Sequence, residues 1–342
     1  MPAQTFEVRV AGSEVVFDCA GDDTVLRAAQ RAGIAFPYEC NVGSCANCKF
    51  ELVEGAVAMR WTEAPAWTER DRQRKRYLGC QAEPRSDLAV KLRLDPRCAP
   101  QHRPQHVHAT LQSRRDLTHD LHEFAFRLEQ PMWFEPGQYA LAYLPGVAGA
   151  RAWSMSNLAG DGTTWEFQVR RVPGGRGSAA LFDALPIGAR IELDGPYGMA
   201  WLRREAPRDI VCIAGGSGLA PMLSIARAAM IEPRLADRTL HFFYGARTVA
   251  DLCGEDLLRA LPGAAERLRH VAVVSNPALS GEGAAWTGPV GFVHEEVQRR
   301  LNAQLAAMEI YFAGPPVMAT AVQRMLLDAG VPPSQIHFDA FY

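Results

Sequence analysis

The chain has 342 residues, of which 48% are hydrophobic and 22% charged, so it can fill more than one packed core. Its 36 Lys and Arg against 38 Asp and Glu give a formal net charge of -2, which excludes the strong positive field expected of a nucleic-acid-binding protein. The sequence shows no signal peptide and no apolar stretch long enough to span a membrane, so we expect a cytoplasmic protein.

The first 95 residues predict a small α+β domain. Apolar and polar residues alternate in two short runs within residues 5–17, which indicates paired strands, and a helical pattern covers residues 24–33. Two further strand patterns lie at residues 49–55 and 87–94. The cysteine-rich segment between them has no periodicity, so we expect it to be a loop.

The rest of the chain predicts a linker and two larger domains. Residues 96–105 contain three prolines and no periodicity, which is typical of a linker. Residues 106–205 show short strands separated by Gly and Pro turns, with one helix-like insert, and indicate an antiparallel β-barrel. In residues 206–342 buried strands alternate with helices, which indicates an α/β domain with a parallel sheet. The predicted fold is therefore multidomain.

Four cysteines have the spacing of an iron–sulfur site. Cys40, Cys45 and Cys48 form the pattern C-x4-C-x2-C, and Cys80 follows after 31 intervening residues. In the plant-type ferredoxin arrangement, thiolates with this kind of spacing hold a 2Fe-2S cluster. A tetrahedral zinc site commonly uses two close pairs, so zinc fits the pattern less well. The other cysteines are interpreted as buried thiols: Cys19, Cys98, Cys212 and Cys253.

The segment around these cysteines resembles the 2Fe-2S ferredoxin domain in the reductase components of bacterial multicomponent oxygenases. The stretches FPYEC and FELVEG and the short ligand loop between them recur there in this order. The resemblance implies a β-grasp-like domain with the four spaced cysteines as cluster ligands. Five cationic residues lie just before Cys80, within residues 69–77. They are interpreted either as a solvated helix face or as a docking surface for the electron acceptor.

A second resemblance concerns flavin binding. The stretch RAWSMSN resembles the flavin motif of the ferredoxin-NADP reductase superfamily, which implies Arg151 on a flavin phosphate, Trp153 on the isoalloxazine and Ser154 near flavin N5. The family commonly has tyrosine where Trp153 stands. A Gly-rich turn follows, which is either an ordinary turn or a pyrophosphate site that favours FAD over FMN. The implied contacts here are Val169, Gly174, Gly175, Gly177 and Ser178.

Three further stretches resemble the nicotinamide domain of the same superfamily. CIAGGSGLAPML fits its pattern GG-x-G-x-x-P, which presents helix N–H groups to a dinucleotide phosphate. FYGAR and AGPPVM match in the right order, beside the adenine ribose and the nicotinamide. The implied contacts are Gly215, Gly216, Ser217, Gly218, Pro221, Tyr244, Gly245, Arg247, Gly314, Pro315 and Met318. The final HFDAFY implies that Asp339 and Tyr342 lie near the flavin, in a catalytic group with Ser154. The alternative is that Asp339 and Tyr342 have ordinary packing and capping roles.

The resemblance as a whole implies an NADH-dependent oxidoreductase, similar to the electron-transfer components of toluene, xylene and carbazole oxygenases. Hydride would pass from NADH to FAD, and single electrons would pass through a 2Fe-2S cluster to an oxygenase that hydroxylates an aromatic compound. Delivery to a separate ferredoxin is one alternative, and a redox-sensing protein whose cluster controls a partner is another. Arg247 also keeps NADPH open as the donor, although NADH is the expected one.

Overall fold

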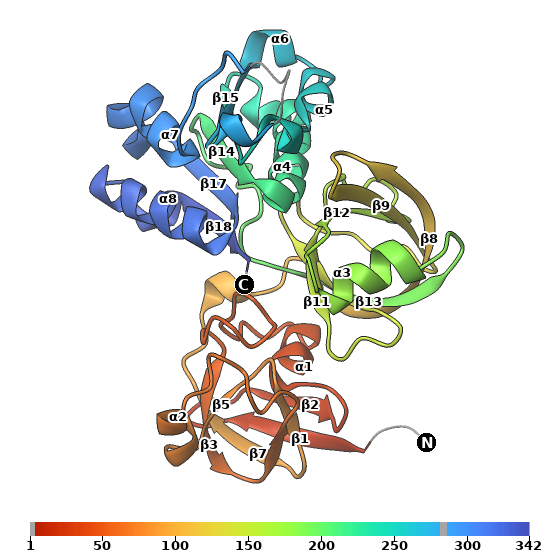
Figure 1. The fold of residues 1–342 in the computed structure, drawn as a ribbon. Coiled ribbons are helices and arrows are strands. Elements are labelled where there is room, and N and C mark those ends of the chain that lie inside the picture. The colour runs from red at the N-terminus through yellow and green to blue at the C-terminus, as the bar shows by residue number, and fades with distance from the viewer. Residues whose placement is uncertain (1–3, 281–285, 342) are drawn as a thin grey trace. The chain divides into compact units, whose positions relative to one another are not determined.

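The structure is a computed structural model that describes residues 4–280 and 286–341. The chain forms two compact units, and Figure 1 labels their helices and strands. Unit 1 holds the N-terminal part of the chain up to His106 together with Asp194–Tyr197. Unit 2 holds Val107–Leu193 and the chain from Gly198 onward.

Unit 1 has the α+β composition expected from its sequence. Its elements are β1 (Thr5–Val10), β2 (Val16–Ala20), α1 (Val25–Arg31), β3 (Lys49–Glu54), β4 (Val57–Met59), α2 (Glu69–Gln73), β5 (Arg76–Leu78), β6 (Ala82–Pro84) and β7 (Leu88–Lys91). The main sheet has the order β2-β1-β7-β3-β5, and β4 pairs with β6. β1 and β7 are parallel, whereas β3 is antiparallel to β5 and β7. Alternate residues of β1, Val8 and Val10, are buried together with most of α1, because they face one core.

The segment expected as a linker begins against unit 1. Pro96–Cys98 forms a 3-10 turn, and Cys98 is buried. The Gln30 side chain of α1 donates a hydrogen bond to the Cys98 carbonyl at 3.2 Å. The first turn of this proline-rich segment is therefore fixed to α1 rather than extended in solvent.

The first sheet of unit 2 is a barrel. Its elements are β8 (Gln105–Asp116), β9 (Leu121–Leu128), β10 (Tyr139–Tyr143), β11 (Arg151–Ser154), β12 (Thr164–Arg170), α3 (Arg176–Ala179), which continues as a π-helical turn, and β13 (Arg190–Tyr197). The strand order is β11-β10-β13-β8-β9-β12. A bridge between Met155 and Phe167 joins the chain after β11 to β12, so the two ends of the sheet meet. The antiparallel barrel expected from the Gly and Pro turns is confirmed.

The second sheet of unit 2 is entirely parallel, as expected. Its elements are β14 (Ile210–Gly215), α4 (Leu219–Ile231), β15 (Leu240–Ala246), α5 (Glu255–Arg259), α6 (Ala264–Arg267), β16 (Leu268–Val274), α7 (Val293–Leu301), β17 (Glu309–Gly314), α8 (Pro316–Asp328) and β18 (Ile336–Ala340). The order β16-β15-β14-β17-β18 is doubly wound, with α4 on one face and α7 and α8 on the other (Figure 1).

Both faces of this parallel sheet are covered. Cys212 and Tyr244 pack with α4 in one apolar cluster, whereas Ile213 and Phe243, which point to the opposite face, pack with α7 and α8 in another. Because residues of the central strands face one of two apolar layers, β14 has a continuous apolar and buried sequence at Ile210–Gly215.

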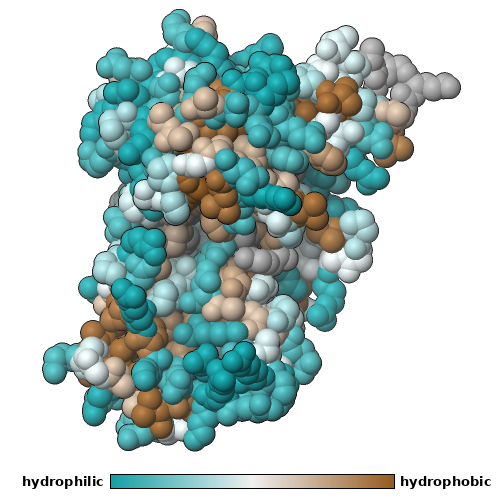
Figure 2. All heavy atoms as spheres, turned by 90° about the vertical axis from the view of Figure 1, so that its left-hand side faces the viewer, coloured by the Kyte–Doolittle hydropathy of each residue, from teal (hydrophilic) through white to brown (hydrophobic). Residues whose placement is uncertain are grey.

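Hydrophilic residues predominate on the molecular face shown in Figure 2, and apolar residues appear there in separate groups. Large apolar side chains that are exposed include Trp61, Trp133 and Phe292. Within residues 4–280 and 286–341, none of the helices combines the length and the apolar character needed to cross a lipid bilayer.

Candidate functional site

The glycine-rich loop expected to bind a dinucleotide lies at the topological switch point of the parallel sheet. β14 ends at Gly215, and a 3-10 turn of Gly216–Gly218 leads into α4. The strand order reverses between β14 and β17, and open α/β sheets bind ligands in the crevice at such a point. The segment after β17 packs against this loop, since a Cβ on Gly215 would lie 2.6 Å from the Met318 sulfur. A Cβ on Gly218 would overlap the Ala313 carbonyl oxygen, so this glycine permits the close approach.

Tyr244 and Arg247 lie at the carboxyl end of β15, as expected. The Tyr244 side chain is 1% exposed, and its hydroxyl lies 3.4 Å from the carbonyl oxygens of Gly216 and Asp251. Tyr244 therefore supports the glycine loop from inside the fold, whereas Arg247 is exposed. The other expected residues lie around the same edge of the sheet: Ser217 in the 3-10 turn, Pro221 in α4, Gly245 on β15, Gly314 on β17 and Pro315 before α8.

Sequence reasoning missed Arg170, which ends β12 beside this loop. A Cβ on Gly216 would lie 3.6 Å from the centre of the Arg170 guanidinium. That guanidinium is 3.5 Å from a carboxylate oxygen of Asp120 and 3.8 Å from one of Asp251. Its position at the end of a barrel strand was the only signal that Arg170 could be a binding residue. That signal is weak, because an arginine at a strand end is ordinarily solvated.

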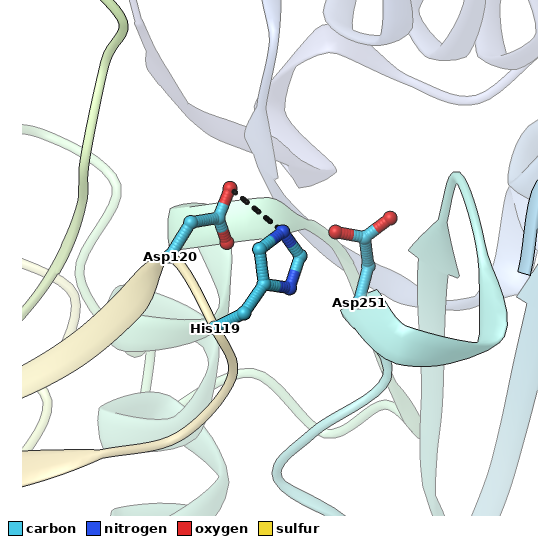
Figure 3. A group of neighbouring side chains, drawn as sticks. All are labelled: His119, Asp120 and Asp251. Atoms are coloured by element: carbon cyan, nitrogen blue, oxygen red, sulfur yellow. Dashed lines mark ion pairs between the residues drawn. The ribbon is translucent and has the colours of Figure 1, made fainter.

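The same two carboxylates form a group with His119, shown in Figure 3. One ligand atom from each residue lies within 4.8 Å of the others, which is the arrangement a metal ion would need. His119 is exposed, however, and Arg170 already places a cation against both Asp120 and Asp251. Because that cation compensates the carboxylates, we assign the group to ion pairing and not to metal binding.

The two stretches expected to bind flavin come together in the barrel. Arg151 lies on β11, and Gly177 follows the Gly-rich turn in α3. A Cβ on Gly177 would lie 2.8 Å from Arg151 Nε, so the absence of a side chain at Gly177 leaves room for the Arg151 guanidinium. Burial lowers the pKa of Arg151, and the nearby Arg176 guanidinium lowers it further. Two cations beside a helix start form a suitable place for a diphosphate, which fits FAD. Sequence reasoning missed Arg176.

Ser178 stabilises the rest of the Gly-rich turn through its side-chain hydrogen bonds. Gly174 has a positive φ of 70°, and the Ser178 hydroxyl accepts a hydrogen bond from Val172 N at 3.1 Å. Ser178 thus fixes the turn that presents Gly175 and Gly177. Val169, on the preceding strand, is 8% exposed and packs in the barrel core.

Ser154 and Asp339 are far apart in sequence but are in direct contact. The Ser154 hydroxyl, at the end of β11, donates a hydrogen bond to the Asp339 carboxylate on β18 at 2.5 Å. Trp153 precedes it and is half-buried, with its ring 5.8 Å from that of Phe167. Tyr342, the third residue expected in this group, lies outside the described residues. The contact joins the flavin motif to the last strand of the parallel sheet.

The four spaced cysteines lie in two segments, with three in the loop between α1 and β3 and Cys80 two residues after β5. Cys48 Sγ lies 3.4 Å from Cys80 Sγ. Cys40 and Cys45 are tied by the loop itself, since Cys40 N donates to Cys45 Sγ at 3.5 Å. The residues with positive φ in this loop are Asn41, Gly43 and Ala46. They turn backbone N–H groups toward the sulfurs, which suits a cluster held by four thiolates.

The pKa values of the spaced thiols differ from one another because the thiols hydrogen-bond in pairs. The pKa of Cys45 is raised by its hydrogen bond to Cys40 and by burial. The pKa of Cys48 is raised by its hydrogen bond with Cys80 and by burial. The pKa of Cys40 is lowered to about 6, first because the Cys45 thiol donates a hydrogen bond to its sulfur and further because loop N–H groups point at it. Ser44 N, for example, lies 3.4 Å from Cys40 Sγ. Burial also raises the pKa of the thiols interpreted as structural: Cys19, Cys98, Cys212 and Cys253. Among the thiols of the described residues that have a shifted pKa, only Cys40 has a lowered one.

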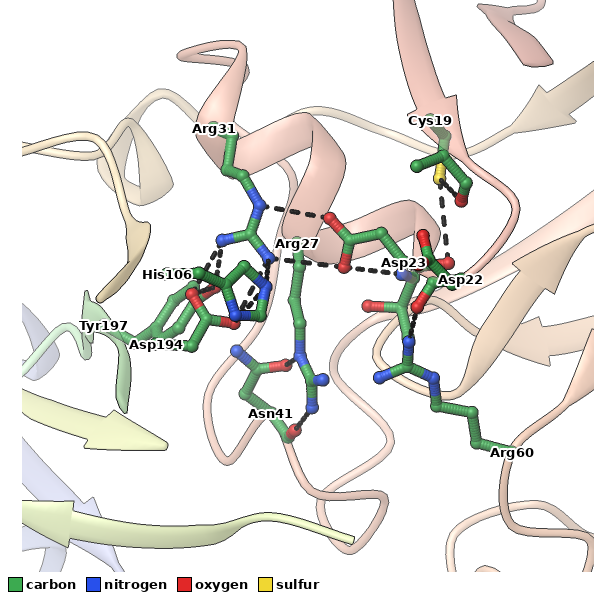
Figure 4. Close-up of polar contacts among 12 residues, drawn as sticks. Cys19, Asp22, Asp23, Arg27, Arg31, Asn41, Arg60, His106, Asp194 and Tyr197 are labelled. Atoms are coloured by element: carbon green, nitrogen blue, oxygen red, sulfur yellow. Dashed lines mark hydrogen bonds and ion pairs between the residues drawn. The ribbon is translucent and has the colours of Figure 1, made fainter. Parts of the chain in front are cut away.

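Two arginines of α1 support this part of unit 1, as Figure 4 shows. The buried Arg27 guanidinium donates hydrogen bonds to the side-chain oxygen and the carbonyl of Asn41, each at 3.2 Å. These bonds fix Asn41 of the cysteine loop to α1. Arg31 binds Asp194 through two nitrogens at 2.6 and 3.2 Å. Asp194 is fully buried and also accepts from the Tyr197 hydroxyl at 3.0 Å. Sequence reasoning missed Arg27 and Arg31, because charged residues on a helix are usually solvated.

Comparisons with known proteins agree with this arrangement. Family models match three consecutive parts of the chain: a 2Fe-2S iron-sulfur cluster binding domain at residues 8–85, an oxidoreductase FAD-binding domain at 108–201 and an oxidoreductase NAD-binding domain at 212–324. The ferredoxin–NAD(P)+ reductase CarAd of Metapseudomonas resinovorans is 40% identical, over 95% of this chain and 96% of that protein. The chain belongs to the ferredoxin–NAD(P)+ reductase family.

This ferredoxin–NAD(P)+ reductase is also 37% identical to the ferredoxin–NAD+ reductase component of the alkene monooxygenase system of Xanthobacter autotrophicus, over 95% of this chain and 97% of that one. The solved structure of the ferredoxin reductase in carbazole 1,9a-dioxygenase matches it with a TM-score of 0.90 and 37% identity, over 99% of both chains. The predicted family, the three-part fold class and the three cofactor-binding domains are confirmed. The reductase is an oxidoreductase with 2Fe-2S-, FAD- and NAD-binding domains.

Proposed function

We propose that this reductase oxidises NADH through FAD and passes single electrons through a 2Fe-2S cluster to a partner oxygenase that hydroxylates an aromatic compound. The observation that carries the proposal is the joining, in one chain, of a dinucleotide loop, a flavin motif and a four-thiol group. When bound, FAD supplies the conversion between the two-electron hydride of NADH and the single electrons that a 2Fe-2S cluster accepts. The printed names of the relatives, which include alkene monooxygenase and carbazole dioxygenase systems, support an oxygenase partner.

The residues at the switch point would bind the nicotinamide dinucleotide. Gly215–Gly218 would present backbone N–H groups to its diphosphate, and the bare Cα atoms would leave room for it. Arg170 lies beside the loop and can add a charge-assisted contact. Arg247 is exposed and is the only basic residue of FYGAR, so we propose NADH as the donor and not a dinucleotide with a further phosphate.

The barrel residues would bind and orient FAD. Arg151 would hold its diphosphate with the N-terminal end of α3, while Trp153 would cover one face of its ring system. The Ser154 hydroxyl donates its one hydrogen bond to the Asp339 carboxylate, which leaves the lone pairs of the serine oxygen free to accept from a bound N–H group. Asp339 therefore fixes which way this hydroxyl faces, and Ser154 would hold the reacting edge of the flavin in one orientation.

The thiols Cys40, Cys45, Cys48 and Cys80 would hold the 2Fe-2S cluster. The test is Cys80→Ala, which removes a ligand that is fully buried. We expect loss of the visible cluster spectrum and of protein-acceptor reduction, with FAD content and NADH–ferricyanide turnover retained, because the flavin and nicotinamide residues belong to unit 2. The matched control is Cys98→Ala, also buried in unit 1, which should keep both activities. Retention of protein-acceptor reduction in Cys80→Ala would contradict the proposal.

A separate ferredoxin is the second candidate for the acceptor. The specific support is that two relatives are themselves named ferredoxin reductases. Reduction of a purified oxygenase component by the reductase and NADH, with and without an added ferredoxin, separates the two. Hydroxylation without ferredoxin supports direct delivery, and a strict requirement for ferredoxin supports the second candidate.

A further inference from the structure

A strongly basic surface lies on the main sheet of unit 1. β3 is placed between β5 and β7, with Glu51 opposite Arg76 on one side and opposite Lys91 on the other. Side chains alternate between the faces of a strand, so Lys49 joins Glu51 on this face and Arg93, two residues after Lys91, continues it. The pairing register thus gathers cations from three separate segments around one carboxylate.

These side chains line a groove with a volume of about 420 Å³. The residues of this basic groove are Lys49, Phe50, Glu51, Arg76, Lys91, Leu92 and Arg93. Four of the seven are cations and one is an anion, in a chain whose overall charge is -2. The charge of the groove is therefore opposite in sign to that of the whole molecule, which marks it as a local feature.

The cations of the basic groove are only partly neutralised. Lys49 pairs with Asp71 at 2.8 Å, and Arg76 reaches Glu51 at 3.8 Å with both side chains nearly half exposed. Lys91 and Arg93 are exposed and form no salt bridge among residues 4–280 and 286–341. Within the cationic run that the sequence singled out, Arg72 is occupied elsewhere, since it pairs with Glu69 and stacks on the ring of Trp67.

The basic groove is continuous with the segments that carry two of the thiols. Lys49 directly follows Cys48, and its partner across the sheet, Leu78, lies two residues before Cys80. Gly79 N donates to the Cys48 carbonyl at 2.8 Å, which holds the two segments together where their sulfurs meet. A molecule in the groove would therefore contact Lys49, which follows Cys48, and Arg76, which begins the strand that leads to Cys80.

We propose that the basic groove is a docking site for an acidic electron-acceptor protein, one that carries carboxylates around its redox centre. This inference rests on the proposed function, because it assumes that electrons leave through the cluster. Charge complementarity selects the occupant: a carboxylate-rich protein surface can pair with Lys91 and Arg93, which have no salt-bridge partner in the described part of the chain. Such pairing speeds encounter and fixes orientation, which electron transfer between proteins requires.

The test is the double charge reversal Lys91→Glu with Arg93→Glu in the full holoprotein. The matched control reverses Arg269 and Arg324, two exposed cations of unit 2, and changes the net charge by the same amount. Binding of an acidic plant-type ferredoxin in its oxidised form is measured by biolayer interferometry at low and high salt. We expect the groove variant to raise the Kd at low salt at least about tenfold and to flatten its salt dependence, with little change in the control.

Three results would overturn the proposal. They are a wild-type protein that does not bind the ferredoxin at low salt, equal weakening by the groove variant and the control, and tighter groove-dependent binding of a single-stranded oligonucleotide than of the ferredoxin. Failure of the proposed function has a different signature. A wild-type holoprotein without NADH–ferricyanide turnover would refute the function, whereas the binding measurement uses oxidised partners and does not depend on turnover.

Discussion

Replacing Arg31 with Met tests the ion pair between α1 and the buried Asp194. Arg31 contacts Asp194 through two nitrogens and Asp23 through a third at 3.0 Å, and Asp194 is fully buried. In Arg31→Met, Asp194 keeps the Tyr197 hydroxyl and lies 3.7 Å from His106, but it loses its permanent cation. An uncompensated buried charge costs about 3 to 5 kcal/mol. Exchange protection of α1 amides should therefore fall at least about one hundredfold, since 1.4 kcal/mol is tenfold.

The pH dependence of this loss has a defined sign. Burial alone raises the pKa of Asp194, but the Arg31 guanidinium holds it below its ordinary value. The pair therefore stabilises the wild type above the ordinary carboxyl pKa, and this contribution is lost as the pH falls through the lowered pKa. In Arg31→Met burial acts unopposed, so the folded-state pKa of Asp194 rises. Protonation then favours the folded variant, and its deficit should shrink as the pH falls from about 8 to about 5.

The assay is hydrogen exchange with mass spectrometry on the full chain, because peptides from α1 and from Asp194–Tyr197 report unit 1 alone. The companion variant adds Asp194→Asn, which removes the buried charge and keeps the shape of the side chain. It should recover most of the lost protection, leaving about 1 to 2 kcal/mol for the missing hydrogen bonds. If Arg31→Met costs no more than the double variant, or if its deficit grows at low pH, the reasoning from a buried uncompensated carboxylate is wrong.

Three further outcomes test the other sites. Arg151→Ala should purify without FAD, whereas Trp153→Tyr should keep it, because only the first removes a charge-assisted phosphate contact; a yellow Arg151→Ala protein with full flavin content would sink the assignment. Gly218→Ala should raise the KM for NADH at least about tenfold with FAD retained, because the added Cβ overlaps the Ala313 carbonyl oxygen; an unchanged KM would remove this loop from the site. Steady-state kinetics should give a kcat/KM for NADH at least about tenfold above that for NADPH, about 1.4 kcal/mol, and equal values would contradict the proposed donor.

The cofactor-binding segments could be predicted because their spacing and composition are local properties. The C-x4-C-x2-C pattern before Cys80, the RAWS stretch and the GG-x-G-x-x-P loop each place their chemistry within a few residues of one turn. The two larger folds were also predictable, since a barrel and a parallel sheet have different apolar periods. The short strands β4, β5 and β6 were not, because each has only three residues and too few alternations to show a period.

The tertiary structure alone decided which distant residues meet. The bond between Ser154 and Asp339 spans 185 residues, and the Arg31–Asp194 pair spans 163. No local pattern encodes such a partner, because a side chain at a strand end or on a helix is solvated unless the fold brings another element over it. Likewise the basic groove follows from the register of β3 against β5 and β7, since shifting either pairing by one residue would send its cations to the opposite face.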